Sequence, residues 1–248
     1  RGMDIGTGKI SREEMDGVPH HMIDILNPDE TFSVSDFQSQ VEMLVKDIES
    51  RGKLPVIAGG TGHYIKALIE GYQFNDENQD EIDALTAEYD KLSDDALYKQ
   101  LLDIQPNSDI HPHNRKRIIR QLVKQNLDVP VKKAYTKKLE YDTFLLGLTA
   151  DRSVIYERIN QRVAGMFDDG LLEEVTALTQ AGMSKTAGQA IGYKEFLPYF
   201  KGEIALADVM ERIQAHSRQY AKRQLTFFRN QLDIRWYDIA HSDRDIIF

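Results

Sequence analysis

The sequence predicts an α/β fold in which a parallel sheet carries an inserted all-helical subdomain. Apolar runs that end in glycine or at a turn are each followed by a helical pattern, as in parallel βα units. One long, strongly charged segment interrupts this rhythm and shows helical periodicity without a convincing strand. With 248 residues, the chain is long enough for one large domain that contains an insertion.

The first predicted βα unit starts with "LPVIAGG", residues 54–60, which is typical of a buried strand. Its glycines lead into a helix predicted over residues 63–69. Two weaker strand candidates are "HHMIDIL" in the N-terminal part and "DIRWYDI" in the C-terminal part. Together these segments would extend the parallel sheet.

The second predicted unit starts with "TFLLGL", residues 143–148, as its strand. Thr149 or Asp151 is a suitable N-cap for the helix that follows. Apolar side chains recur at helical spacing over residues 155–166, so one face of this helix is expected to pack against the core.

Charge is distributed unevenly along the chain. We assign residues 1–72 and 139–248 to the α/β core and residues 73–138 to the helical insertion. Nine acidic side chains lie within residues 75–95, whereas residues 111–138 carry nine Lys or Arg and one Asp. A local positive surface on a protein of net charge -9 is what a phosphate backbone requires, although such runs are also typical of solvated helix faces.

The composition excludes several kinds of site. The chain has no cysteine, so it forms no disulfide and no thiolate metal site. No apolar run approaches the ~20 residues that cross a bilayer, and no signal-peptide pattern opens the chain. We therefore expect a cytoplasmic protein without a membrane partner. The seven histidines show no H-x-x-x-H pattern, so we expect no dedicated transition-metal site.

The N-terminal segment "MDIGTGKIS" resembles the end of a phosphate-binding loop. A true loop follows the pattern G-x-x-x-x-G-K-[ST], in which backbone N–H groups cradle phosphates and the hydroxyl holds magnesium. Met3 stands where the first glycine belongs, and Ile10 stands where the hydroxyl belongs. We therefore predict that residues 6–9 do not form a phosphate loop.

A second glycine-rich stretch, "GGTG" at residues 59–62, falls between a predicted strand and a predicted helix. Backbone N–H groups and the helix dipole favour anions at that edge of an α/β sheet. Thr61 adds a hydroxyl that can donate to or accept from a substrate. A tight turn with Thr61 as the helix cap accounts for the same residues.

Two arginines in the helix after residue 150 also fit phosphate chemistry. Arg158 and Arg162 lie four residues apart on one helical stripe, where two guanidinium forks can clamp a diphosphate. The alternative is that they pair with Glu157 or with other surface carboxylates.

The last predicted helix is basic. Residues 212–229 contain no acidic side chain, and Arg218, Lys222 and Arg229 fall on one ridge of an ideal helical wheel. Aromatic residues are interleaved with these cations, a pattern that RNA-binding surfaces use. Aromatic residues at such positions also pack in cores, and we assign one of the two adjacent phenylalanines, Phe227 or Phe228, to that role.

Taken together, eight segments resemble one family, the bacterial tRNA dimethylallyltransferases, also called isopentenyl-tRNA transferases. In order they are "RGMDIGTGK", "VPHHMIDIL", "FSVSDF", "PVIAGGTGHYIKAL", "HPHNRKRIIR", "ERINQRVAGMFDDGLLEEV", "QAIGYKE" and "SRQYAKRQLTFFR". The resemblance runs nearly end to end. It implies a P-loop NTPase-like parallel-sheet core with the inserted helical subdomain.

Members of that family begin with a true phosphate loop, G-P-T-[AG]-S-G-K-[ST], and a short motif that contains an aspartate. The 248 residues contain neither ahead of "RGMDIGTGK". We therefore expect the main phosphate loop and the catalytic aspartate to lie outside this sequence. The stretch "RQLVKQ" that begins at Arg120 departs from the family's usual "RALE" continuation.

The resemblance implies a prenyl transfer. The dimethylallyl group of dimethylallyl diphosphate would move to N6 of the adenosine at position 37, adjacent to the tRNA anticodon, and diphosphate would leave. An aspartate would accept the N6 proton, while the phosphate loop, Mg²⁺ and an arginine share the diphosphate. The implied partners are dimethylallyl diphosphate and the anticodon stem-loop, and we expect a monomer.

The resemblance also assigns residues to these roles. Thr61 and Arg162 are the expected catalytic residues, and Gly60, Arg158 and Arg162 are expected at the diphosphate. The helical insertion would grip the far side of the stem-loop. The residues expected to contact tRNA are Lys116, Arg117, Ile118, Ile119, Arg120, Gln189, Ala190, Ile191, Gly192, Tyr193, Lys194, Lys222, Arg223, Gln224, Phe228 and Arg229.

Three other functions fit parts of the sequence. An ATP-dependent nucleotide kinase would share the P-loop core but would not need the two basic stretches. A prenyltransferase that acts on free adenine nucleotides would not need the basic insertion. A non-catalytic RNA-binding module would need neither the phosphate loop nor the aspartate, and the presence of both upstream in the gene would exclude it.

Overall fold

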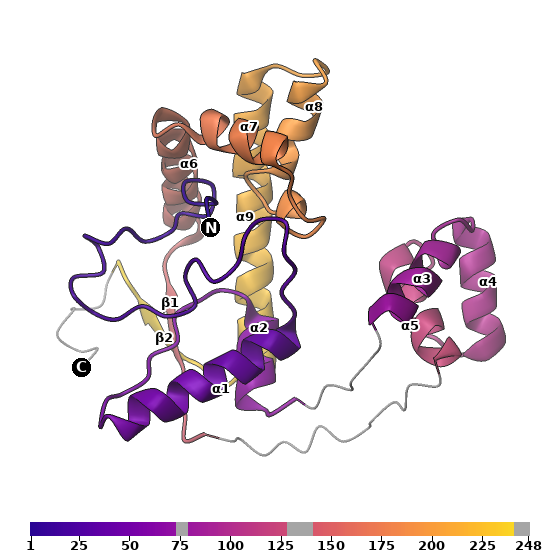
Figure 1. The fold of residues 1–248 in the computed structure, drawn as a ribbon, viewed down its shortest axis with the longest axis horizontal. Coiled ribbons are helices and arrows are strands. Elements are labelled where there is room, and N and C mark those ends of the chain that lie inside the picture. The colour runs from indigo at the N-terminus through magenta and orange to yellow at the C-terminus, as the bar shows by residue number, and fades with distance from the viewer. Residues whose placement is uncertain (73–78, 128–140, 241–248) are drawn as a thin grey trace. The chain divides into compact units, whose positions relative to one another are not determined.

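The computed structural model describes residues 1–72, 79–127 and 141–240. The chain divides into two compact units, shown in Figure 1. The first unit comprises Arg1–Glu70 with Lys138–Phe248, and the second comprises Gly71–Lys137. Each has its own hydrophobic core.

The first unit contains six α-helices and two strands among the described residues. The helices are α1 (Val34–Ser50), α2 (Gly62–Ile69), α6 (Arg152–Asp168), α7 (Leu171–Ala181), α8 (Leu197–Phe200) and α9 (Leu206–Gln231), and the strands are β1 (Leu146–Thr149) and β2 (Arg235–Asp238). The strands pair in parallel with Leu146 opposite Arg235. Two short 3-10 helices, Ala187–Gln189 and Lys194–Phe196, connect α7 to α8.

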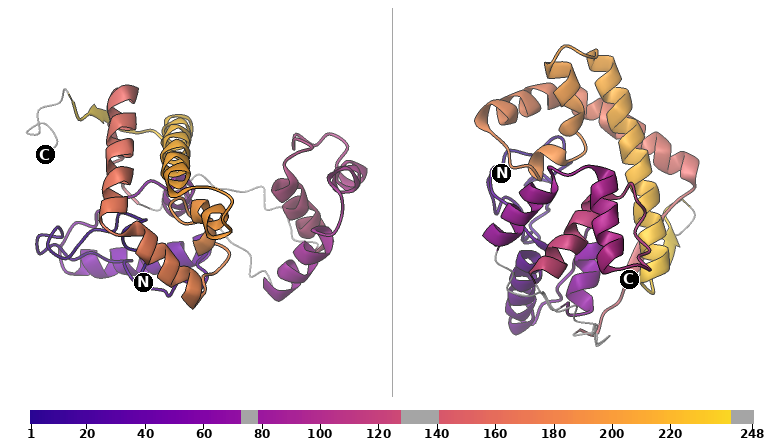
Figure 2. Two further views of the ribbon diagram at one scale, coloured as in Figure 1. Left: turned by 90° about the horizontal axis from the view of Figure 1, so that it is seen from above. Right: turned by 90° about the vertical axis from the view of Figure 1, so that its right-hand side faces the viewer.

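The core of this unit forms where α6, α7 and the N-terminal half of α9 meet. Val163 on α6, Val175 on α7 and Val209 on α9 are each at most 1% exposed and belong to one cluster. The helix α9 is 26 residues long, and α6 packs against it, as Figure 2 shows. The spacing of apolar residues that predicts the helix over 155–166 therefore buries one face of α6 in this core.

Several predicted elements are confirmed. The helix α2 covers the predicted residues 63–69, and α6 extends the predicted helix in both directions. Strand β1 overlaps the predicted residues 143–148, and β2 lies within "DIRWYDI". Asp151 is the N-cap of α6, as one of the two predicted candidates, but its side chain makes no capping hydrogen bond.

Two predicted strands are wrong. The segment 54–60 is not part of a ladder among the described residues, and Leu54 and Val56 are 84% and 80% exposed. Its apolar side chains therefore have no sheet neighbour to cover them there. In "HHMIDIL", Met22 and Asp24 adopt φ values of 62° and 55°, which no extended strand accommodates.

The second unit is built from the helices α3 (Gln79–Tyr89), α4 (Asp94–Ile104) and α5 (Arg115–Asn126). Leu97, Leu101 and Leu122 are at most 1% exposed and form its core. Arg115 at the start of α5 joins that helix to the start of α4, because its guanidinium donates to the Asp94 carboxylate at 2.7 Å. The predicted insertion spans residues 73–138, and its parts at 73–78 and 128–138 lie outside the described residues, including four of the nine basic side chains.

Within the described ranges, no helix combines the length and the apolar character needed to cross a membrane.

Candidate functional site

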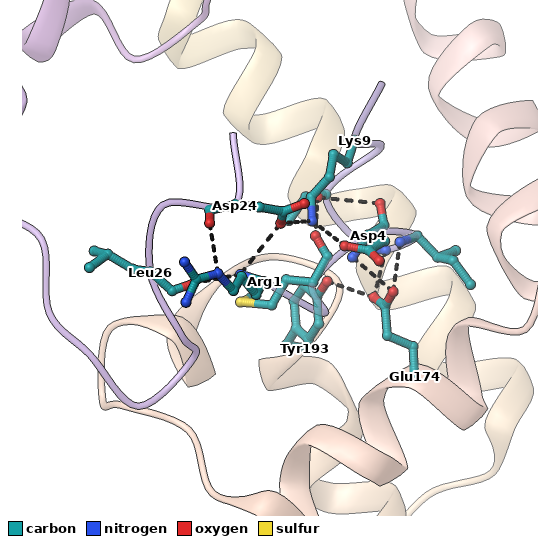
Figure 3. A network of polar contacts seen from close by, with 11 residues as sticks. Arg1, Asp4, Lys9, Asp24, Leu26, Glu174 and Tyr193 are labelled. Atoms are coloured by element: carbon teal, nitrogen blue, oxygen red, sulfur yellow. Dashed lines mark hydrogen bonds and ion pairs between the residues drawn. The ribbon is translucent and has the colours of Figure 1, made fainter. Parts of the chain in front are cut away.

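One carboxylate fastens the N-terminal segment to α7 (Figure 3). Glu174 Oε2 accepts backbone N–H groups from Asp4 and Ile5 at 2.8 and 2.7 Å. Glu174 Oε1 accepts the N–H of Gly6 at 3.0 Å and the hydroxyl of Tyr193 at 2.7 Å. Hydrogen bonds to an ionised acceptor are shorter and stronger than neutral ones. The N-terminal loop, α7 and the turn that contains Tyr193 are thereby joined at a single side chain.

Two glycines allow this junction to close. A Cβ atom at Gly6 would lie 2.7 Å from the Tyr193 ring, so only glycine fits there without displacing the ring. Gly192 has a φ of +96°, and its Cβ would lie 3.2 Å from the Gly6 carbonyl oxygen. Burial, and next the hydrogen bond to Glu174, raise the pKa of Tyr193 above its usual value.

The structure agrees with the prediction that residues 6–9 do not form a phosphate loop. The Gly6 N–H is bound to Glu174, and the N–H groups of Gly8 and Lys9 donate to the carbonyls of Ile5 and Asp4, each at 2.9 Å. The Lys9 ammonium contacts the carboxylates of Asp4 and Asp24. Three of the four backbone N–H groups of residues 6–9 are therefore already occupied.

A second carboxylate connects the same turn to α9. Glu195 is 3% exposed and accepts the N–H of Gly192 at 2.9 Å. Its other oxygen lies 2.6 Å from Nδ1 of His216, which is on α9. The turn at residues 189–196 is therefore held at two points. Tyr193 binds Glu174 on α7, and Glu195 binds His216 on α9.

The "GGTG" turn lies against the C-terminal half of α9. The Gln224 amide donates to the Gly60 carbonyl at 2.8 Å. A Cβ atom at Gly60 would meet that amide at 2.0 Å, and one at Gly62 would meet the Phe227 ring at 2.2 Å. Thr61 is exposed, and although it occupies the N-cap position of α2 its hydroxyl makes no capping bond. The capping explanation is therefore not supported, and the hydroxyl is available to a substrate.

The predicted pair of arginines on α6, Arg158 and Arg162, is exposed. Among the described residues neither Arg158 nor Arg162 forms an ion pair, and Glu157 instead accepts from Gln161 at 2.9 Å. Within the same part of the chain, no hydrogen bond or ion pair joins either arginine to Thr61. Their guanidinium groups are thus free to bind an anion.

The basic ridge predicted on α9 is shorter than expected. Arg218 donates to Asn160 on α6 at 2.5 Å, so it holds the two helices together. Lys222 and Arg223 are exposed. Arg229 is also exposed and stacks over the Trp236 ring with 5.5 Å between the guanidinium carbon and the ring centroid.

The two adjacent phenylalanines of α9, Phe227 and Phe228, are half-buried. Phe227 packs against Gly62, as the assignment of one phenylalanine to packing predicts. Phe228 is half-buried, and its ring meets that of Phe227 edge-on at 5.9 Å. Gln224 is half-buried and already bound to Gly60.

Four residues expected to contact tRNA are buried instead. Ile118 and Ile119 are 0% and 5% exposed because the apolar face of α5 forms the core of the second unit. Tyr193 is 1% exposed and bound to Glu174, and Gly192 is buried against Gly6. Their side chains support the fold and offer no surface to RNA.

The remaining predicted contacts differ in exposure. Lys116, Arg117 and Arg120 are exposed on α5, and Arg117 lies 3.8 Å from Asp109. Ala190 and Ile191 are half-buried against the core of the first unit, whereas Gln189 is exposed. Lys194 is half-buried, with its ammonium 3.9 Å from Glu195.

Sequence reasoning missed the two anchoring carboxylates, Glu174 and Glu195. The only signal for Glu174 is the pair of acids in the first turn of α7, which the helix dipole alone explains. Glu195 stands in a segment of mixed polarity, and no pattern there distinguishes it from a surface acid. Glu174 holds residues 4–6 and Glu195 holds His216, and these partners are distant in sequence.

Comparisons with known proteins identify the family of the chain. The family model described as IPP transferase matches residues 1–231. The tRNA dimethylallyltransferase of Macrococcus caseolyticus is 44% identical over 247 residues, which cover 97% of this chain and 79% of that protein.

Solved structures are similar over the same extent. The tRNA isopentenylpyrophosphate transferase of Bacillus halodurans is 41% identical, with a TM-score of 0.73 over 99% of this chain and 80% of that chain. A eukaryotic dimethylallyltransferase that acts on tRNA is 25% identical, with a TM-score of 0.72 over 94% of this chain and 63% of that chain.

We predict that Tyr193→Phe lowers the free energy of unfolding by about 1.5–3 kcal/mol at neutral pH, because a hydrogen bond to a charged acceptor is lost. Since the folded pKa of Tyr193 is raised, its contribution is present below about pH 10 and is lost as the pH rises above that value. Denaturant unfolding at several pH values should show both effects. Tyr199→Phe is the control, because the Tyr199 hydroxyl makes no hydrogen bond among the described residues, and an equal loss in both variants would contradict the role of Glu174.

Proposed function

The chain belongs to the IPP transferase family, and on that premise we propose that it transfers the dimethylallyl group of dimethylallyl diphosphate to N6 of the adenosine at position 37 of tRNA. The observation that carries the proposal is the 44% identity to a tRNA dimethylallyltransferase over 97% of this chain. The exposed Thr61 hydroxyl and the unpaired guanidinium groups of α6 support it, because both suit a diphosphate substrate.

We further propose that the first unit is a P-loop NTPase-like core. In support, β1 and β2 pair in parallel and β1 leads directly into α6, which is the βα order of such cores. The "GGTG" turn also leads directly into a helix, α2.

The reaction needs one bond to form and one to break. The N6 nitrogen attacks the first carbon of the dimethylallyl group, and the bond between that carbon and the diphosphate oxygen breaks with its electron pair on diphosphate. A base must accept the N6 proton, and the family resemblance gives that role to an aspartate. Arg162, with Arg158, would stabilise the charge on the leaving diphosphate. Thr61 would hold a phosphate oxygen near the attacking nitrogen.

We propose that Mg²⁺ binds to the oxygens of the substrate diphosphate. No group of three His, Asp or Glu side chains within the described ranges could hold a metal ion. Mg²⁺ commonly takes substrate phosphate oxygens and water with few protein ligands, and when bound it would neutralise charge on the diphosphate.

The RNA partner is proposed to be the anticodon stem-loop. Exposed cations on α9, Lys222 and Arg223, and on α5, Lys116 and Arg120, can neutralise backbone phosphates. Removing the adenosine from its stack costs a few kcal/mol, which contacts to the deformed loop would offset. We assign the enzyme to the cytoplasm, as a monomer.

The direct test uses the full-length gene product with Mg²⁺, dimethylallyl diphosphate and an anticodon stem-loop RNA. We expect the RNA mass to rise by one five-carbon prenyl unit, and fragmentation should map it to the adenosine 3′ of the anticodon. Prenylation of free adenine nucleotide instead would support the free-nucleotide enzyme. RNA binding without any prenylation would support the non-catalytic module.

We predict that Arg162→Ala lowers the transfer rate by about 10²-fold or more and leaves RNA affinity nearly unchanged, because the lost guanidinium acts on the leaving group. Single-turnover transfer and equilibrium binding measure the two quantities separately. Gln161→Ala, at the preceding exposed position of α6, is the control. If Arg162→Ala reduced binding and not the transfer rate, its assignment to the diphosphate would be wrong.

We predict the opposite pattern for Lys222→Ala combined with Arg223→Ala. RNA binding should weaken and its dependence on salt should flatten, with the slope of log K against log salt smaller by about 1–2, because two phosphate contacts are lost. Fluorescence titrations of the stem-loop at several salt concentrations measure that slope. An unchanged slope would remove these residues from the interface.

A further inference from the structure

A cleft lies between the start of α6 and the C-terminal half of α9. Its volume is about 460 Å³. Arg152 and Tyr156 line it from α6, and Lys222 and Arg229 line it from α9. The cleft lies just past the carboxyl end of β1, which is the edge of an α/β sheet where ligands bind.

The cleft is positively charged. Arg152, Lys222 and Arg229 contribute three cations, and Asp151 is its single acidic residue among the described ones. Within the described part of the chain, none of the three cations has a carboxylate partner. Three cations and one carboxylate at a single cleft leave an excess of positive charge, which favours an anionic ligand.

Aromatic rings orient two of these cations. The Arg152 guanidinium lies 5.7 Å from the centroid of the Tyr156 ring, and Arg229 is similarly placed over Trp236 at 5.5 Å. Stacking of this kind holds a guanidinium in place while its N–H groups stay available to an acceptor. The cleft therefore presents two guanidinium groups that are already oriented by aromatic rings, and the Lys222 ammonium lines it as well.

We propose that this cleft binds one phosphodiester group of the RNA backbone, with Arg152 as a contact that the family resemblance did not assign. This inference rests on the proposed function. Lys222 lines the cleft and also belongs to the exposed pair Lys222 and Arg223, so the cleft is continuous with the cations already proposed to contact RNA. A backbone phosphate carries the single negative charge that such fork-shaped donors bind well.

The test measures binding of the anticodon stem-loop to the full-length protein as a function of salt. Arg152→Gln should weaken binding several-fold and reduce the salt slope by about 1, because one phosphate contact is lost. Arg152→Lys should restore most of the slope, since it keeps the charge.

Arg212→Gln provides the matched control. Arg212 is exposed on the same helix and lies ten residues before Lys222, about 15 Å away along the axis. Its replacement removes the same charge and should leave the slope unchanged. Equal slopes in wild type and Arg152→Gln would overturn the inference, as would a change that Arg212→Gln reproduces.

The outcomes also separate this inference from the proposed function. If the wild-type protein fails to bind the stem-loop, the proposed function itself fails. If the wild type binds and Arg152→Gln instead raises only the KM for dimethylallyl diphosphate, the cleft belongs to the small substrate and the inference is wrong.

Discussion

The arrangement of the first unit depends on the carboxylate of Glu174. It accepts three backbone N–H groups from residues 4–6 and the hydroxyl of Tyr193. Loop amides of this kind otherwise require water or secondary structure as partners, and unsatisfied donors cost about 1–3 kcal/mol each. One side chain of α7 therefore replaces a ladder of backbone hydrogen bonds and fixes a loop that has no regular structure.

This anchor is connected to the segments that carry the candidate site residues. Tyr193 belongs to the turn at residues 189–196, and Glu195 in the same turn is bound to His216 on α9. The opposite half of α9 holds the "GGTG" turn through Gln224. As a result α9 sets the positions of the Thr61 hydroxyl and of the exposed cations, while Glu174 and Glu195 hold the remaining segments against it. Precise placement of this kind is what positioning of a diphosphate and a nucleophile requires.

Periodicity predicted the elements whose structure is determined locally. The helices α2 and α6 appear where apolar spacing and turn residues place them, because both signals lie within the segment itself. The segment 54–60 has an equally apolar pattern, but a strand requires a partner, and a sequence pattern does not reveal whether that partner is present. The same limit applies to Glu174, whose partners lie about 170 residues earlier in the chain.

The candidate site also combines residues that local sequence patterns identify with residues whose surroundings only the fold determines. Family motifs identified the segments 116–120 and 189–194, but a motif covers every residue of a segment whereas RNA reaches only its exposed face. Ile118 and Tyr193 are not part of the surface, since their side chains fill the cores of the two units. Thr61 and Arg162 are exposed, and within the described part of the chain their side chains make no hydrogen bond or ion pair, while their catalytic roles stay predictions. Arg152 was missed because its significance depends on Lys222 and on the cleft between two helices.

Hydrogen exchange of the backbone amides of residues 4–6 tests the central role of Glu174 most directly. These amides should be protected in the wild type and should exchange much faster in Glu174→Gln, which keeps only one acceptor oxygen for the three donors. Glu173→Gln, at the adjacent exposed position on α7, should leave their protection unchanged. Rapid exchange in the wild type, or the same loss of protection in both variants, would contradict the account.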